Sequence, residues 1–225
     1  MTASLPTAVA LAAAPDLTFA VTGVAAERFA ALPTLRFGVE IARVGGGPVS
    51  SITLTTAIRI DVARRRYDAA ARRALTELFG VPERWGGTLH PLAWTRTTTQ
   101  VPAFADRTTT ELTVECGYDT ELAVTKYLRA VRDGEVPLDF LFSGTVFFRS
   151  PEGLLRTARI SWSKDASFPL PAALWHELTD RYSAGGTWLR LSRETFDRLD
   201  DHRARHVLGS PDAAVRHLLD HSGAP

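Results

Sequence analysis

Hydrophobic and polar residues alternate along the segment from Pro137 to Arg149. Every second position from Leu138 to Phe148 is apolar or glycine, whereas the positions between them mix charged, hydroxyl and apolar side chains. A period of two over this length predicts a long β-strand with one face in a hydrophobic core. Gly144 interrupts the apolar face, and a glycine there is expected where a bulge, a bend or a closely approaching neighbour requires it.

A hairpin is predicted directly after this strand. The turn Ser150-Pro151-Glu152-Gly153 places proline where a type I turn needs a φ of about −65°, and glycine where a left-handed residue must follow. This chemistry favours a three-residue loop with a bulge at the glycine. In the resulting register Val146 faces Ala158 and Phe142 faces Trp162.

The same reasoning predicts the other elements. Alternating segments predict strands at 17–22, 35–42, 51–62, 94–101 and 109–116, with a short strand at 187–191 in the tail. The helical period predicts helices at 69–79, 120–131, 172–182, 193–207 and 211–221, with Asp68, Asp119, Ser192 and Ser210 as N-caps. Short links between alternating strands predict antiparallel pairing. The expected fold is mainly β with α additions, an antiparallel immunoglobulin-like β-sandwich of seven strands with inserted helices and an α-rich C-terminal extension.

Three segments follow from this pattern. Residues 1–15 are Ala-rich without the basic start of a signal peptide, and we interpret them as a disordered leader. Residues 16–168 form the predicted β-sandwich with its inserted helices. Residues 169–225 form a C-terminal extension of helix, short strand, helix and helix, with Gly185-Gly186 as a hinge or linker.

Composition narrows the function classes. The chain has 225 residues and a net charge of +1, so charge alone gives no case for nucleic acid or an anionic membrane. No apolar run approaches the ~20 residues of a membrane helix. Cys116 is the only cysteine, which excludes an internal disulfide or a Cys-cluster metal site and suits a reducing compartment. We therefore expect a cytoplasmic protein without a cofactor, in which Cys116 is a buried, inert thiol.

A candidate interaction surface combines a basic run with aromatic residues. Arg64-Arg65-Arg66, with Arg72 and Arg73 nearby, could bind an acidic partner or a phosphate, although a solvated strand end is the favoured interpretation. Trp85 and His90 lie in the Pro/Gly-rich connection 81–93, and long connections are often functional. Trp85 is expected either to anchor an interface or to cover the open edge of the sandwich. Trp188 in the tail completes the surface, and no catalytic residue is assigned.

The tail carries two further patterns. The segment from Trp188 to Leu199 resembles ribbon–helix–helix regulators, which pair their strand across a dimer and read DNA with it. From residue 187 on, arginines and carboxylates balance to zero charge, which argues against phosphate neutralisation. A homodimer through this tail stays open.

Histidines form the second pattern in the tail. His202 and His206 stand four residues apart, as do His217 and His221, so each pair shares a helix face with a spacing that suits a metal ion. In an antiparallel helical hairpin, however, the two pairs are expected at opposite ends. The sequence therefore predicts no metal site.

Four segments resemble an uncharacterised family of high-GC bacteria that is known only as a domain of unknown function. They are RWGGTLHPLAW (84–94), AVTKYL (123–128), DGEVPL (133–138) and LFSGTVF (141–147). Members of that family can be encoded beside nickel–iron hydrogenase genes, which implies an accessory or maturation role. The resemblance brings no established catalytic residues.

We therefore expect a non-enzymatic, cytoplasmic accessory or binding protein that acts through protein–protein contacts. The implied partner is a hydrogenase subunit or maturation factor. One alternative is a DNA-binding dimer formed through the tail. Another is an enzyme whose site is assembled around the 81–93 connection, which predicts a concave pocket where this loop meets polar residues from other segments. The positions of Trp85, His90 and Ser143 would discriminate it.

Overall fold

The computed structural model describes residues 14–117, 122–183 and 191–222. The chain divides into two compact units, Met1–Gly185 and Gly186–Pro225, whereas the sequence analysis drew its last boundary at residue 169. The predicted leader (apart from its last two residues), the cap at Asp119, the glycine linker and nearly all of the strand predicted at 187–191 lie outside the described residues.

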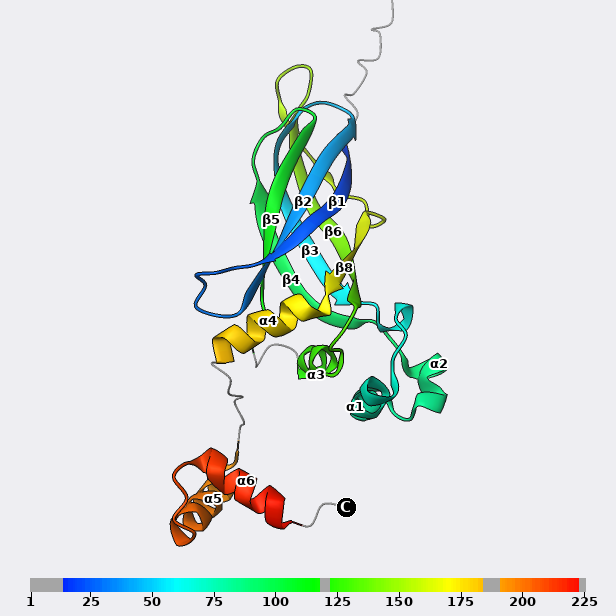
Figure 1. Ribbon diagram of the computed structural model, residues 1–225. Coiled ribbons are helices and arrows are strands. Elements are labelled where there is room, and N and C mark those ends of the chain that lie inside the picture. Colours follow the sequence, from blue (N-terminus) through cyan, green and yellow to red (C-terminus); the bar gives the residue numbers. More distant parts are fainter. Residues whose placement is uncertain (1–13, 118–121, 184–190, 223–225) are drawn as a thin grey trace, which may run out of the picture. The chain divides into compact units, whose positions relative to one another are not determined.

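The first unit contains two antiparallel β-sheets with several helices (Figure 1). The smaller sheet has the order β1 (Asp16–Ala26), β2 (Thr34–Gly45), β5 (Arg107–Glu115). The larger sheet has the order β4 (Leu92–Val101), β3 (Val49–Ile60), β6 (Glu135–Arg149), β7 (Leu155–Arg159), and β8 (Asp165–Pro171) also pairs with β6. Mainly antiparallel β structure with helical additions is thus confirmed.

Strand β6 is the long strand that the alternation predicts, and it changes partner along its length. On one edge it pairs with β3 from Leu138 to Phe148. On the other edge β8 pairs with its first half, up to Leu141, and β7 with its second half, from Thr145. Its inward side chains are buried as expected, with Phe140 fully buried.

The hairpin register is confirmed near its turn. Val146 pairs with Ala158, and Gly153 has a φ of 82°. The prediction fails further along, because the returning chain leaves the sheet after Ile160 and re-enters as β8. Trp162 is therefore 93% exposed instead of facing Phe142. Strand β8 was not predicted, because its two prolines are typical only of edge strands.

Gly144 occupies the point where β6 exchanges β8 for β7. Its φ is 133°, and a Cβ atom placed on it would lie 2.0 Å from the Thr53 carbonyl oxygen of β3. The close neighbour that the sequence analysis required for this glycine is therefore backbone, which cannot move aside without breaking the sheet.

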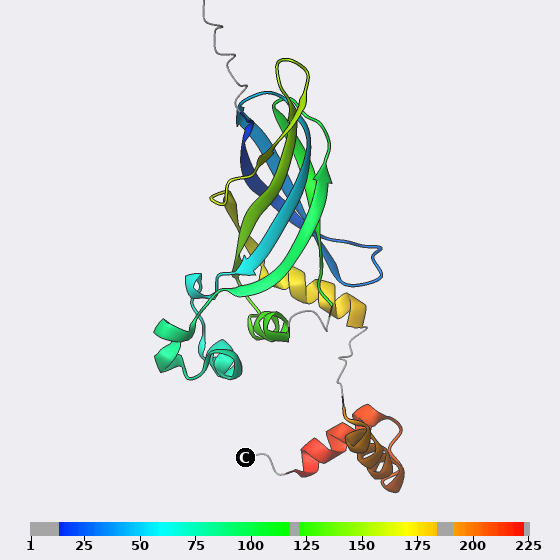
Figure 2. The ribbon, with the colours of Figure 1, turned by 180° about the vertical axis from the view of Figure 1, so that it is seen from behind.

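Helices gather at one end of the sheets, where β3 and β8 end and β4 and β6 begin (Figures 1 and 2). They are the helices α1 (Ala69–Phe79), α2 (Trp85–Thr88), α3 (Leu122–Ala130) and α4 (Ala172–Ser183), with the 3-10 turns η1 (Val62–Arg64) and η2 (Pro82–Arg84). Helix α1 has the predicted bounds, because the Asp68 carboxylate accepts a hydrogen bond from the Ala71 amide and Gly80 closes the last turn. The 81–93 connection, expected as a loop, contains η2 and α2.

One hydrophobic core joins both sheets and the helices. Phe37 of the smaller sheet contacts Phe140 of the larger sheet with ring centroids 5.2 Å apart, and Phe19 stacks on Phe142 at 4.4 Å. Beneath the sheets, the hydroxyl of Tyr67 donates to the Val62 carbonyl, so the hydroxyl of Tyr127 must donate the 2.9 Å bond that joins the two tyrosines.

The second unit contains helices α5 (Arg193–Arg205) and α6 (Pro211–His221). Both start as predicted, with the hydroxyls of Ser192 and Ser210 accepting hydrogen bonds from the backbone of the first turn. Among its described residues only Ala214 is classed as buried. No helix in the described part of the chain is long and apolar enough to cross a membrane.

Replacement of Gly144 by alanine should lower the free energy of unfolding by about 3 kcal/mol or more, because the new methyl group meets the Thr53 carbonyl and the backbone conformation becomes strained. Urea unfolding followed by tryptophan fluorescence measures the change. Gly86→Ala is the matched control, since a Cβ there meets nothing within 4 Å, and it should shift stability by no more than about 1 kcal/mol. Equal midpoints for the Gly144 variant and the wild type would contradict the assignment.

Candidate functional site

The basic run Arg64-Arg65-Arg66 lies where β3 ends, next to the starts of β6 and α1. Asp61 caps turn η1, and its carboxylate accepts a hydrogen bond from the Ala63 amide. The Asp61 amide in turn donates to the Pro137 carbonyl of β6 at 3.0 Å. The backbone of the run is thus anchored to the sheet independently of the contacts that its side chains make.

The Arg64 guanidinium takes part in a network of ion pairs and hydrogen bonds. Its guanidinium contacts the carboxylates of Asp61, at 2.6 Å, and Asp139, and it donates to the Ser167 hydroxyl at 3.2 Å. The Asp139 side chain is only 13% exposed and also accepts from Arg59. The Arg64 side chain is 44% exposed, so it combines the solvent exposure of the favoured sequence interpretation with these ion pairs.

Electrostatics within this network favour the charged forms. The hydrogen bond to Asp139 raises the pKa of Arg64 despite partial burial of the guanidinium. Burial of Asp139 opposes its ionisation, but the hydrogen bond and charge of Arg64 outweigh this and leave the pKa of Asp139 below its ordinary value.

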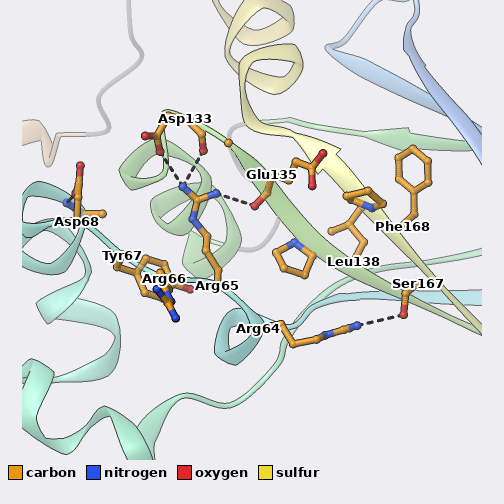
Figure 3. A pocket seen from close by; sticks show the side chains of 14 residues that line it. Arg64, Arg65, Arg66, Tyr67, Asp68, Asp133, Glu135, Leu138, Ser167 and Phe168 are labelled. Atoms are coloured by element: carbon orange, nitrogen blue, oxygen red, sulfur yellow. Dashed lines mark hydrogen bonds and ion pairs between the residues drawn. The ribbon is translucent and has the colours of Figure 1, made fainter.

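Arg65 fastens η1 to the turn before β6. It donates to the carboxylate and the backbone carbonyl of Asp133 at 2.8 and 2.7 Å, and to the backbone carbonyl of Glu135 at 2.7 Å. Its side chain is 12% exposed. Figure 3 shows Arg65 directed at this turn, Arg64 directed at Ser167, and no drawn interaction on Arg66. Two arginines of the run therefore have structural partners.

Two hollows flank the segment Arg65–Tyr67. The first, of about 670 Å³, is drawn in Figure 3 and lies between η1, β8 and the turn before β6, and its lining includes Asp68, Asp133 and Glu135. The second, of about 520 Å³, is the arginine hollow, whose lining residues are Arg65, Arg66, Tyr67, Arg72, Pro82, Trp85 and Leu89. The arginine hollow has three cationic side chains and no carboxylate in its lining.

Arg66 and Arg72 supply the uncompensated charge of the arginine hollow. Both are exposed, and within the described residues neither side chain has an ion pair or hydrogen bond. The sequence analysis noted Arg72 beside the basic run but did not include it in the candidate interaction surface. Its exposed position on α1, one turn after the Asp68 cap, is the sequence signal that could have added it.

Trp85 forms the wall of the arginine hollow rather than an exposed anchor. It is 7% exposed, its ring meets those of Tyr67 and Phe79 edge-on, and its indole N–H donates to the Gly80 carbonyl at 2.8 Å. The alternative in which Trp85 anchors an interface through an exposed ring is wrong, because the indole closes the end of α1.

The other candidate residues do not join this site. His90 is exposed in the link between α2 and β4, and Trp188 lies outside the described residues. Ser143 donates to the Thr55 carbonyl in the middle of the larger sheet, about five strand positions, or ~17 Å, from the end that carries His90. Trp85, His90 and Ser143 therefore do not form one site.

Cys116 is buried as predicted. Its side chain lies in the hydrophobic core, and burial raises the pKa of the thiol to about 12. A thiol in this state is a poor nucleophile.

The tail histidines converge, contrary to the sequence analysis. His202 Nε2 lies 3.2 Å from His217 Nδ1, and the rings of His206 and His217 are 4.7 Å apart. The error was to assume that α5 and α6 pack antiparallel along their full length, whereas the middle of α6 meets the last turns of α5. Burial and the neighbouring imidazoles lower the pKa of His202 and His217.

Comparison with known families gives one match. Residues 14–225 match the family described as "Family of unknown function (DUF6084)". The chain belongs to this family. The predicted membership of a family of unknown function is thereby confirmed, and no curated protein matches the sequence.

Solved structures resemble this DUF6084 chain only remotely. The CARDB domain of the PF1109 protein from Pyrococcus furiosus, solved in complex with di-metal ions, is 10% identical, with a TM-score of 0.28 over 70% of this chain and 92% of that chain. A putative late embryogenesis abundant protein is 14% identical, with a TM-score of 0.28 over 70% and 72%. β-Glucosidase 3B from Thermotoga neapolitana, in complex with glycerol, is 10% identical, with a TM-score of 0.26 over 69% and 17%. TM-scores below 0.5 carry no argument about fold or function.

Replacement of Asp139 by asparagine should lower the free energy of unfolding at pH 7 by about 1–2 kcal/mol, because Arg64 and Arg59 lose a partly buried carboxylate. The pKa of Asp139 is lower in the folded state than the ordinary value of about 3.9. Its contribution to stability is therefore fully present above that value and is lost as the pH falls through the folded pKa.

Urea unfolding between pH 3 and 8 measures the difference between wild type and Asp139→Asn, which should shrink below about pH 4. Glu77→Gln is the control, because Glu77 pairs with Lys126 at the surface. Such a surface ion pair contributes no more than about 1 kcal/mol to the free energy of unfolding. A difference independent of pH would show that the carboxylate charge does not act as described.

Proposed function

We propose that this protein is a non-enzymatic accessory protein that binds an acidic segment of a protein partner in the arginine hollow. The observation that carries the proposal is that Arg66 and Arg72 have no ion pair or hydrogen bond among the described residues, whereas Arg64 and Arg65 are paired with carboxylates. Two unpaired guanidiniums beside an apolar wall attract carboxylates. The lining of the arginine hollow itself holds no acidic residue, although Arg66 also borders the first hollow, whose lining includes carboxylates.

The hollow offers more than charge. Trp85 and Tyr67 are 7% and 8% exposed and are held rigidly by hydrogen bonds and ring contacts. The small apolar surface that they present is therefore preformed and loses no side-chain freedom on binding. Arg65, whose guanidinium is fixed by Asp133, also lines the hollow. A segment that combines Asp or Glu with an apolar side chain would match both features, and guanidiniums recognise carboxylates in a bidentate manner.

Finer features belong to the same proposal. The implied genomic neighbourhood favours a hydrogenase subunit or maturation factor as the partner, and a cytoplasmic location. The ring contacts between the two sheets support an immunoglobulin-like sandwich as the scaffold that holds the site. The concave surface beside Trp85 is also the feature expected for the enzyme alternative, so the experiment must separate a protein partner from a small substrate.

The test is an affinity capture from native cell extract with the tagged wild type and with the charge-reversed variant Arg66→Glu/Arg72→Glu. The wild type should recover a partner in stoichiometric amount, identified by mass spectrometry and carrying an acidic segment. The variant should weaken binding of a peptide of that segment by at least about tenfold, and added salt should weaken wild-type binding as well.

The matched control is Arg96→Glu/Arg159→Glu, which changes the net charge equally at exposed positions on β4 and β7. It should retain the partner. Equal capture by the Arg66/Arg72 variant, or recovery of DNA or a small molecule in place of a protein, would overturn the proposal in favour of the regulator or the enzyme.

A further inference from the structure

We propose that the second unit binds a divalent transition-metal ion of the kind that imidazole prefers, such as Zn²⁺, through His202 and His217, with His206 and His221 completing the site. All four rings lie together, with His202 on α5, His206 directly after it as the C-cap, and His217 and His221 on α6. The centroids of His202 and His206 are 4.3 Å apart, those of His202 and His217 are 5.2 Å apart, and those of His217 and His221 are 4.1 Å apart.

The central nitrogens already have the spacing of metal ligands. Two nitrogens bound to one tetrahedral Zn²⁺ at about 2.0–2.1 Å stand roughly 3.3 Å apart. His202 Nε2 and His217 Nδ1 are 3.2 Å apart. Two histidines four residues apart on a helix also form a known Zn²⁺-binding arrangement, and here both helices supply such a pair.

The tautomer of His221 supports the same conclusion. Its Nδ1 lies 2.7 Å from the His217 carbonyl oxygen. A carbonyl can only accept, so Nδ1 carries a proton, and in the neutral ring Nε2 then keeps a free lone pair. Metal-binding histidines are typically oriented in this way, with one ring nitrogen donating to a carbonyl and the other bound to the metal.

The rings must rotate for the site to close. Among the described residues, no three His, Cys, Asp or Glu side chains are yet arranged to hold a metal ion. The rings of His206 and His221 are exposed, so rotation about their side-chain bonds disrupts no core. Nearby charge is mixed, with Asp220 close to His217 and Arg205 close to His202.

A metal ion would also stabilise this unit, which buries few of its described side chains. The unit spans Gly186–Pro225, and of its described residues only Ala214 is classed as buried. Units below about 40 residues usually need a disulfide, a metal ion or a partner chain, and the only cysteine lies in the other unit. Because imidazoles from both helices would share one ion, metal binding would hold α5 against α6.

The experiment uses the full chain carrying a tag without histidine. Isothermal titration with ZnCl₂ at pH 7.5 should show one ion per chain, Co²⁺ should give the visible absorption of a tetrahedral site, and Mg²⁺ should give neither. His202→Ala/His217→Ala should weaken Zn²⁺ binding at least 100-fold, and His90→Ala, at an exposed histidine of the first unit, should leave it unchanged.

The exposed pair provides a second variant that spares the packing of the helices. His206→Ala/His221→Ala should retain the helical circular dichroism of the wild type and weaken Zn²⁺ binding at least tenfold. In the wild type, Zn²⁺ should slow amide hydrogen exchange in α5 and α6. Absence of Zn²⁺ binding by the wild type, or unchanged affinity in both double variants, would overturn the proposal.

Discussion

The contact between β6 and β3 at Gly144 is the constraint on which the first unit depends. At this residue the two backbones approach so closely that a side chain cannot be accommodated. The approach coincides with the exchange of partners on the opposite edge, where the Phe142 amide donates to Lys164 and the Ile160 amide donates to Gly144. The backbone of Gly144 therefore lets one strand serve two edge partners without a break in its pairing with β3.

The exchange of β8 for β7 along β6 determines which partners Arg64 and Arg65 have. Because β8 pairs only with the first half of β6, Ser167 of β8 lies beside Asp139 of β6, and both side chains accept hydrogen bonds from the Arg64 guanidinium. The turn before β6 receives Arg65. The next residue, Arg66, is exposed and lines both hollows, and its side chain has no ion pair among the described residues. Within one basic run, Arg64 and Arg65 therefore have structural partners, whereas the Arg66 side chain has none among the described residues.

Elements governed by local chemistry were predictable from the sequence. The faces of β6 and the bounds of α1 follow from alternation and from the Asp68 cap, and both agree with the structure. Strand β8 escaped prediction because Pro169 and Pro171 hide an edge strand, whose prolines need no ladder partner on their outer side.

The candidate site was only half predictable, for a different reason. The basic run was visible, and Asp61 lies three residues before Arg64, but the other partners, Asp139 of Arg64 and Asp133 of Arg65, lie about seventy residues further along the chain. Such pairing is set by sheet register and not by local pattern. The prediction that the two histidine pairs lie apart failed because it also depended on tertiary structure. The crossing of α5 and α6 depends on the turn between them, where Val207 has a positive φ of 52°.

The two units hold their helices by different means. In the first unit Leu75 of α1 and Tyr127 of α3 are fully buried, so tertiary packing supplies most of the helix stability. Helix α5 has no buried residue, and it relies on the Ser192 cap and on surface ion pairs such as Arg203–Asp200. Pairs of this kind contribute about 0.3–0.5 kcal/mol each, against about 1 kcal/mol for a cap. The folding of the second unit is therefore far more sensitive than that of the first to anything that binds across its two helices.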